Sequence, residues 1–309
     1  MKKADTDTLL KESLFIRILD KKRRLDRKSP LPKTAVAKLL SEIRLQHTFH
    51  SNAIEGNTLT LSETRLVLEE GITVSQKPLK DYIEAKTNAE AFDLVEKLAK
   101  KSRKIDHVVI QEIHEILMKG LIEDAGKYRT QNVRIVGASK TPPDYSKVPG
   151  VMDKLLGSLK NTNTEPVTTA ALFHHGFVAI HPFSDGNGRM ARLLTNLLLM
   201  QKGYPPIVLR NDDRPKYYRY LRAADSDNLA PFTNFIGRAV DEALLHFLSI
   251  FGKDDELIPL KELAVESPYS QEYLSLRVRQ GRLEGVKIGK IWYSTGNALK
   301  RYIESLEMK

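Results

Sequence analysis

The feature that most constrains the fold is the junction between a glycine-rich turn and a long apolar run. Residues 193–200 predict a buried helix, and the chain enters it through one twelve-residue stretch, His181-Pro182-Phe183-Ser184-Asp185-Gly186-Asn187-Gly188-Arg189-Met190-Ala191-Arg192. Glycine allows sharp turns and close approach of a ligand to the backbone. The first N–H groups of a helix have no intrahelical partner and favour an anion. The sequence therefore predicts a core helix whose N-terminus can hold an anionic ligand.

Four side chains in this stretch bring different chemistry to the same place. His181 is a base that titrates near neutrality, and Asp185 is an oxygen ligand suited to magnesium. Arg189 and Arg192 lie three apart, so both can face one side of the helix and grip phosphate oxygens. Singly, each is an ordinary loop or helix residue. Together they predict a site where a deprotonated hydroxyl attacks a polyphosphate.

The joint pattern resembles the signature of the Fic family of protein adenylyltransferases, His-Pro-Phe-x-Asp/Glu-Gly-Asn-Gly-Arg-x-x-Arg, and no position departs from it. Over about residues 34–250 the resemblance implies an all-α core with a β-hairpin flap. It implies transfer of AMP from ATP to a Ser, Thr or Tyr hydroxyl of a target protein, with His181 as catalytic base and Mg²⁺ held by Asp185. The nucleotide and its phosphates would contact Gly186, Asn187, Gly188, Arg189, Arg192 and Tyr218.

Two positions bear on recognition of the nucleoside. Tyr218 lies where relatives place a tyrosine beside the adenine ring, and an aromatic face can stack on a base. Relatives with this spacing often have asparagine seven residues later, where this chain has Asp225. That departure leaves the details of nucleotide binding open, although an aspartate can still accept a hydrogen bond from a ribose hydroxyl.

A second motif lies about 130 residues upstream, in a predicted helix that covers about residues 46–57. Ser51 and Glu55 are four apart and would share a helix face, and Gly56 is a plausible terminator. From the residues alone this is an ordinary helix end. The resemblance makes it the inhibitory motif, Ser/Thr-x-x-x-Glu-Gly/Asn, whose glutamate would pair with Arg192 and compete with the terminal phosphate of ATP.

The segment after Gly126 differs from the helical sequence around it. Val133, Arg134, Ile135 and Val136 alternate apolar and polar side chains, which predicts a short strand. A two-stranded ribbon without a further sheet partner is marginally stable. The resemblance makes this segment the flap, which holds the target's hydroxyl-bearing segment partly by strand pairing. A plain surface hairpin is the alternative from the residues alone.

Most of the remaining chain is predicted to be helical. Thr60 with Glu63 forms a capping box that starts one of these helices. His174 and His175 are predicted to be structural, because adjacent histidines point to different helix faces and chelate poorly. Helices are expected over residues 7–28, 34–50, 60–70, 81–100, 105–118, 148–159, 167–179 and 190–202.

Three domains are expected: an N-terminal helical extension over residues 1–33, the Fic-like domain over 34–252, and a small domain over 256–309. The last resembles a winged helix-turn-helix, with a helix capped by Ser270 and a wing around Gly289. Its basic residues would face phosphates if the domain binds DNA. Binding of DNA and use for protein contact or dimerisation are equally favoured.

Composition and charge limit which classes of protein this chain can belong to. The 309-residue chain has 41% hydrophobic and 28% charged residues and no cysteine, which excludes disulfides and thiolate metal sites. No apolar run is long enough for a membrane helix, and we expect a cytoplasmic protein without membrane contact. The formal net charge is +10. The basic run Lys21-Lys22-Arg23-Arg24 is expected to be a solvated helix face rather than a nucleic-acid site.

Two other functions stay open from the sequence. Some relatives run the reverse reaction and remove AMP from a target, with the inhibitory glutamate orienting water. A DNA-binding regulator whose Fic-like domain only senses nucleotide is a different class of protein with the same motifs. Relatives often form homodimers, but the oligomeric state, the target and its acceptor residue are not set by the sequence.

Overall fold

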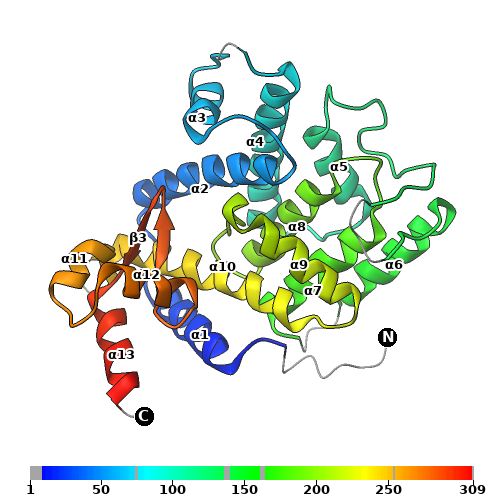
Figure 1. Cartoon of the computed structure of the whole chain (residues 1–309). Helices are drawn as coiled ribbons and strands as arrows, with labels where there is room; N and C mark the ends of the chain where they lie inside the picture. The colour runs from blue at the N-terminus through cyan, green and yellow to red at the C-terminus, as the bar shows by residue number, and fades with distance from the viewer. Residues whose placement is uncertain (1–8, 74–75, 136–139, 161–163, 253–254, 308–309) are drawn as a thin grey trace. The chain divides into compact units, whose positions relative to one another are not determined.

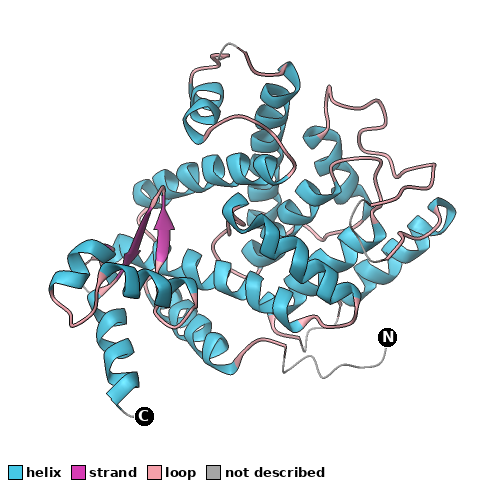
Figure 2. Cartoon of the chain, in the orientation of Figure 1, coloured by secondary structure: helices cyan, strands magenta, loops and turns pink. Residues whose placement is uncertain are grey.

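The computed structural model describes residues 9–73, 76–135, 140–160, 164–252 and 255–307. Over these ranges the chain is mostly helical, with one small three-stranded sheet (Figure 2). It divides into two compact units, the first formed by Met1–Glu12 with Leu40–Gly237 and the second by Ser13–Leu39 with Arg238–Lys309. The three sequence ranges expected as domains do not coincide with these units and stay a prediction.

The first unit is a helical bundle around α8 (Figure 1). Helix α8 packs against α7 and α4, while α4 also contacts α3 and α5 and α7 contacts α6 and α9. The helices of this unit, with α2 and α10 shared between the units, are α2 (Lys33–Ile54), α3 (Leu61–Glu69), α4 (Leu79–Lys100), α5 (His107–Leu117), η2 (Tyr145–Lys147), α6 (Val148–Ser158), α7 (Pro166–Ile180), α8 (Asn187–Gln201), η3 (Asn211–Asp213), α9 (Arg214–Asp225) and α10 (Ala230–Leu248).

Local sequence signals account for several helix ends. The capping box at Thr60 and Glu63 is present, with both reciprocal hydrogen bonds formed. Helix α2 continues to Ile54, beyond the predicted end at residue 50, so most of the predicted inhibitory motif lies on it. Helix α8 begins at Asn187, three residues before the predicted start, because Gly186 takes the left-handed conformation with φ 77° at its N-cap.

The predicted strand in the flap is wrong over the residues that the structure describes. Val133, Arg134 and Ile135 carry no strand, and Val136 lies outside the described residues. A strand needs a hydrogen-bonded neighbour, and the part of the flap described here pairs with no other strand. The alternation of apolar and polar side chains was therefore not enough to predict a hydrogen-bonded strand at these residues.

The second unit contains a small sheet covered by short helices. Strand β3 (Ile291–Ser294) pairs antiparallel with β2 (Val286–Ile288) on one side and β1 (Ile258–Pro259) on the other. Ser270 caps α12 through a bond from the Tyr273 N–H, as predicted. The helical elements here are α1 (Glu12–Arg27), the end of α10, η4 (Ser249–Phe251), α11 (Leu260–Val265), α12 (Gln271–Arg279) and α13 (Gly296–Glu307).

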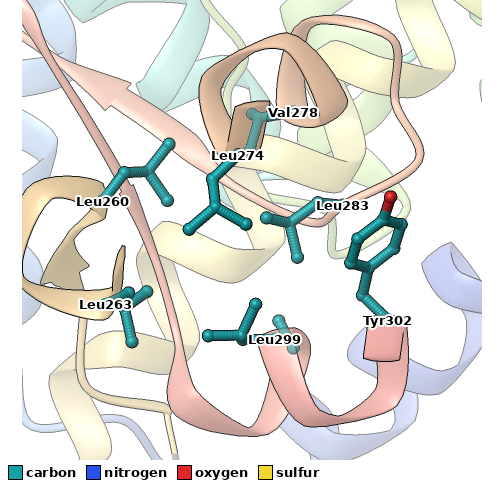
Figure 3. Close-up of a cluster of buried hydrophobic side chains, with 8 residues drawn as sticks. Leu260, Leu263, Leu274, Val278, Leu283, Leu299 and Tyr302 are labelled. Atoms are coloured by element: carbon teal, nitrogen blue, oxygen red, sulfur yellow. The ribbon is translucent and has the colours of Figure 1, made fainter. Parts of the chain in front are cut away.

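The second unit has its own apolar core (Figure 3). Side chains from α11, α12, α13 and the segment before β2 meet in one cluster, formed by Leu260, Leu263, Leu274, Val278, Leu283, Ala298, Leu299 and Tyr302. Each member is less than a tenth exposed, so this short segment buries a continuous set of side chains. Helix α13 was not anticipated from the sequence.

The basic run near the N-terminus is only partly a solvated face. Lys21 is 2% exposed and its Nζ lies 2.7 Å from both Asp241 Oδ1 and Glu284 Oε2. Arg24 pairs with Asp255, a residue placed by the sequence in a linker but 3% exposed here. The expectation for Lys21 was wrong because its partners are distant in sequence. Within the described ranges, no helix is long and apolar enough to cross a membrane.

Candidate active site

The twelve-residue stretch forms the connection from α7 to α8, and its conformation is unusual at His181. This residue is the C-cap of α7 and is left-handed, with φ 52° and ψ 58°. Phe183 is fully buried and stacks on the His114 ring, with 3.6 Å between ring centroids. The loop is therefore fixed by aromatic packing on one side while His181 itself stays partly exposed.

Hydrogen bonding fixes which nitrogen of His181 can act as a base. Nδ1 lies 3.3 Å from the carbonyl oxygen of Val178, so this nitrogen carries the proton and donates it. Nε2 then holds the lone pair, and within the described ranges the ring's hydrogen bond is made by Nδ1. Burial lowers the pKa of His181 below its ordinary value, and the bond to Val178 together with the charges of Glu55 and Asp185 partly offsets this. The imidazole is thus neutral at neutral pH.

The start of α8 leaves backbone donors facing the loop. The first intrahelical bond runs from Met190 N–H to Gly186 O, so the N–H groups before it have no helical acceptor. The Asn187 side chain bonds both the N–H and the carbonyl of Phe183, which closes the loop. A Cβ at Gly186 would lie 2.7 Å from Met118 Sδ, so the turn needs glycine here.

Arg192 contacts both residues of the predicted inhibitory motif. Its Nε donates to Ser51 Oγ at 2.8 Å, and its Nη2 donates to the Ser51 carbonyl at 2.9 Å and to Glu55 Oε1 at 2.6 Å. The guanidinium is 2% exposed, whereas the Glu55 side chain is 32% exposed. Nη1 of Arg192 is buried without a partner within the described part of the chain. One donor of this arginine is therefore left over.

The Glu55 carboxylate lies at the N-terminus of α8. A Cβ built on Gly188 would collide with Glu55 Oε1 and would lie 3.3 Å from Nη1 of Arg192. An anion at this position is stabilised by the free N–H groups and the helix dipole. The carboxylate therefore occupies the place where the sequence predicts a phosphate.

Arg189 is also buried and lies between two carboxylates. Its Nη1 is 3.2 Å from Glu84 Oε1 on α4, and its Nη2 is 3.8 Å from Asp185 Oδ2. Glu84 Oε2 accepts a further bond from Asn57, two residues after Glu55. Both arginines of the stretch are thus engaged by carboxylates.

Tyr218 lies on α9 close to the same residues. The Arg214 guanidinium sits 5.1 Å from its ring centroid and donates through Nε to the carbonyl of Ile54, the last residue of α2. Asp225 accepts from His175 Nε2 at 3.0 Å, so at least one of its oxygens is engaged within the protein. His174 bonds Thr195 and Tyr217 within the core, in agreement with a structural role.

Comparison with known proteins identifies the family. The Fic/DOC family profile matches residues 104–199, which contain His181 and the start of α8. The chain is 36% identical over 234 residues to the protein adenylyltransferase Fic of Nematostella vectensis, a match that covers 75% of this chain and 55% of that protein. This chain belongs to the Fic/DOC family.

Further relatives support this family assignment. The protein adenylyltransferase Fic of Aedes aegypti is 33% identical over 286 residues, a match that covers 88% of this chain and 56% of the Aedes aegypti protein. This chain thus spans about half the length of the curated relatives it matches.

The same fold is found in solved structures. A Fic-domain-containing signalling protein from Bacteroides thetaiotaomicron has a TM-score of 0.71 at 27% identity, over 75% of this chain and 96% of that one. Fic-1 from C. elegans has a TM-score of 0.69 at 28% identity, over 77% of this chain and 71% of that one. The mostly helical fold expected from the sequence is therefore confirmed.

The residues around Asp185 fit a magnesium ion that is shared with a nucleotide. Asp185 is half exposed, with its side chain 54% accessible, and its Oδ1 accepts from Gly186 N–H at 2.6 Å. No cluster of three or more His, Asp or Glu ligands is found within the described ranges. Magnesium commonly takes one or two carboxylates plus substrate phosphates and waters, so a single accessible carboxylate in this Fic site suffices.

Three residues of this Fic site were missed by sequence reasoning. His114 Nε2 donates to the Asp185 carbonyl at 3.0 Å, and its Nδ1 accepts from Gly126 N–H at 2.9 Å. Glu84 and Arg129 likewise hold parts of the site. No local pattern marks these residues, since each reaches partners dozens of positions away.

The base of the flap is held by side chains instead of a strand ladder. Asn132 bonds Asp144 and the Tyr145 N–H, while Arg129 bonds main-chain carbonyls on both arms of the flap. Val133 and Ile135 are partly buried and Arg134 is exposed, all beyond these contacts.

Proposed function

We propose that this chain is a protein adenylyltransferase that transfers AMP from ATP to a hydroxyl side chain of a target protein. The observation that carries the proposal is the pairing of a neutral imidazole, with Nε2 available, and an anion site at the start of α8. That anion site already holds the Glu55 carboxylate. The relatives named as protein adenylyltransferases support the same activity, although this chain spans only about half their length.

The reaction follows from the protonation state of His181. Nε2 takes the proton from the acceptor hydroxyl, and the resulting oxygen attacks the α-phosphorus of ATP in line. The bond between the α-phosphorus and the bridging oxygen breaks, and pyrophosphate leaves. The N–H groups at Asn187 and Gly188 and the donors of Arg189 and Arg192 stabilise the negative charge that develops on the phosphates.

Asp185 would hold Mg²⁺, which neutralises phosphate charge when it is bound. Tyr218 would stack on the adenine ring. With Asp225 already accepting from His175, we assign no ribose contact to that carboxylate. The flap residues Val133 and Ile135, with Arg134, would contact the segment that carries the acceptor hydroxyl.

Glu55 acts as an inhibitor in this proposal. Its carboxylate and the terminal phosphate of ATP require the same donors, namely the Arg192 guanidinium and the start of α8. Ser51 strengthens the inhibited state, because its hydroxyl and carbonyl both accept from Arg192. Nucleotide that binds while Glu55 is in place would be displaced from the in-line position.

Intact-mass spectrometry after incubation with ATP and Mg²⁺ tests the proposal. The Glu55→Gly variant should add AMP mass to itself or to added proteins, and Glu55→Gly with His181→Ala should add none while still binding ATP. Absence of AMP mass with Glu55→Gly, despite measurable ATP binding, would contradict the proposed transfer and favour a nucleotide sensor. Competition among ATP, CTP, GTP and UTP identifies the nucleotide.

One observation favours the reverse reaction as a second candidate. The Glu55 carboxylate lies at the start of α8 beside Gly188 and Arg192, where it can orient a water molecule toward the reaction centre. Loss of AMP from a pre-modified substrate with wild-type protein, but not with Glu55→Gly, would support removal.

We also propose that residues 256–309 form a winged helix-turn-helix that contacts DNA. In support, α12 is followed by the hairpin β2–β3, and three exposed cations lie at the end of α12, in the loop after it and in the hairpin turn, namely Arg279, Arg282 and Lys290. Backbone contacts by such cations make binding fall steeply with salt. A gel-shift series across salt concentrations tests this, and a lack of salt-dependent binding to any duplex would contradict it.

A further inference from the structure

One buried arginine connects the loop that carries His181 with both arms of the flap. Arg129 is 4% exposed. Its Nε donates to the His181 carbonyl at 2.8 Å, Nη1 to the Gln131 carbonyl at 2.8 Å, and Nη2 to the Pro143 carbonyl at 2.6 Å. Its own backbone N–H donates to the Pro182 carbonyl at 2.9 Å. A single side chain thus holds three segments together.

This arginine is paired in an unusual way. A buried charge is normally paired with an opposite charge, since desolvation is costly. No carboxylate within the described ranges forms an ion pair with Arg129, and its partners are main-chain carbonyls. Burial lowers its pKa, and the nearby Asp144 offsets this only in part. All three guanidinium bonds go to main-chain carbonyls of the His181 loop and the flap, which points to a role in the site.

The backbone at His181 explains what that role is. A left-handed conformation in a residue other than glycine costs about 1–3 kcal/mol and persists only when its surroundings enforce it. At His181 three bonds do so: its N–H donates to the Phe177 carbonyl, and Arg129 holds its carbonyl and that of Pro182. The Arg129 side chain therefore supplies one restraint on the strained backbone of His181, and the Arg129 backbone N–H adds one at the neighbouring Pro182.

We propose that Arg129 is a positioning residue that fixes the His181 backbone and the two arms of the flap in one frame, so that the imidazole and the acceptor hydroxyl meet in line. The inference rests on the proposed adenylyl transfer. A planar guanidinium can direct donors at three separate carbonyls, whereas an ammonium is a single point of charge. Lysine at this position would keep the positive charge but could not direct donors at all three carbonyls.

The kinetic test uses Glu55→Gly as the background. Adding Arg129→Lys should lower the maximal rate of self-modification about 100-fold, because a misplacement of about 1 Å near the reacting atoms costs that much. The ATP concentration at half-maximal rate should stay within about 2-fold. An unchanged maximal rate would overturn the inference. Loss of transfer in Glu55→Gly with Arg129 intact would instead be a failure of the proposed function.

Two matched changes at the flap separate positioning from simple stability. Gln131 offers only its carbonyl to Arg129, so Gln131→Ala should leave the rate unchanged. Asn132→Ala removes another side-chain link of the flap without touching His181, and it should lower the rate much less than Arg129→Lys. Equal losses in Asn132→Ala and Arg129→Lys would show that only flap order matters and would overturn the role at His181.

A spectroscopic measurement decides the inference without any transfer activity. In ¹⁵N-histidine-labelled protein, long-range ¹H–¹⁵N spectra report which ring nitrogen of His181 carries the proton, with His181→Gln giving the assignment. The intact chain should show the Nδ1–H tautomer that donates to Val178. Arg129→Met should give a mixture of tautomers at unchanged overall fold. An unchanged tautomer in Arg129→Met would contradict positioning by Arg129, whatever the pKa of His181 becomes when the charge is removed.

Discussion

Two buried cations of this protein, Arg192 and Lys21, differ in the exposure of their carboxylate partners. Both side chains are 2% exposed. Lys21 lies between Asp241 and Glu284, whose side chains are only 7% and 10% exposed. Arg192 pairs with Glu55, which is 32% exposed. The first pair is enclosed by protein, while the second has one partner that can leave into solvent.

The groups around the two cations also differ. Lys21 has two carboxylates at 2.7 Å, and Arg17 and Arg301 bind the outer oxygens of those carboxylates. Arg192 keeps Nη1 without a partner within the described residues, next to Gly188. A buried donor without a partner costs about 1–3 kcal/mol. Arg17 Nε and Glu284 Oε2 of the Lys21 cluster are likewise buried without a hydrogen bond within the described residues, so the two clusters differ in the exposure of their carboxylates and not in completeness of pairing.

The largest expected effect comes from breaking the enclosed pair. Lys21→Met leaves Asp241 and Glu284 buried without the ammonium, and the free energy of unfolding should fall by about 3–5 kcal/mol. Chemical denaturation measures it. Arg23→Met, an exposed site on the same helix, should change stability by less than about 0.5 kcal/mol. Equal effects of the two changes would remove the distinction between the enclosed and open pairs.

As the pH falls, the region around the open pair, Arg192 with Glu55, should lose stability first. Burial lowers the pKa of His47 to about 3 and that of His114 to about 4, so both histidines are neutral when folded. The unfolded chain takes up these protons near pH 6.5, so stability falls as pH drops from 6.5 toward 4. His114 alone accounts for about 3 kcal/mol, and His114→Gln should remove that share of the pH dependence.

The enclosed pair should respond at lower pH. Lys21 and Arg301 hold the pKa of Glu284 at about 2 although burial opposes this. Its contribution to stability is therefore present above pH 4.5 and is lost as pH falls toward 2. Hydrogen exchange should show the first unit losing protection at higher pH than the second. Simultaneous loss in both units would contradict this order.

Removing the carboxylate of the open pair, Arg192 with Glu55, should change the transfer activity more than the stability. Glu55→Gly removes a charge-assisted hydrogen bond of about 1.5–3 kcal/mol that competes with nucleotide, so transfer should rise about 10- to 100-fold. Labelled-ATP incorporation measures the rise. Because Glu55 is about one-third exposed and Arg192 keeps both bonds to Ser51, the free energy of unfolding should fall by less than in Lys21→Met. An unchanged or lower rate would contradict an inhibitory role.

The smallest expected effect is at Ser51. Ser51→Ala removes the acceptor for Arg192 Nε but leaves the Ser51 carbonyl bond, so inhibition should weaken by about 1 kcal/mol, or about 5-fold in transfer rate. Ser51→Thr keeps a hydroxyl and should behave as wild type. Equal rates for Ala and Thr at this position would show that the hydroxyl has no part in holding Glu55.

Much of the helical structure in both units could be predicted from the sequence, because its helix signals are local. The capping box at Thr60 and the Ser270 cap need only residues three positions away. The end of α2 and the start of α8 were each misplaced by a few residues: α2 continues to Ile54, and α8 begins early because the left-handed Gly186 is its N-cap. The predicted strand in the flap was wrong because apolar–polar alternation is a local signal, whereas a strand also needs a hydrogen-bonded neighbour.

The sequence alone determined the twelve-residue loop, its residue chemistry and the helix that follows, since turns, caps and helix dipoles depend on neighbours along the chain. Tertiary structure decided the partners. Arg129 and His181 are 52 positions apart, and Lys21 and Asp241 are 220 apart. Pairing over such separations depends on how the helices pack, and no spacing rule encodes it. Family resemblance, not spacing, anticipated Glu55 with Arg192, and nothing in the sequence anticipated Arg129 beneath the flap.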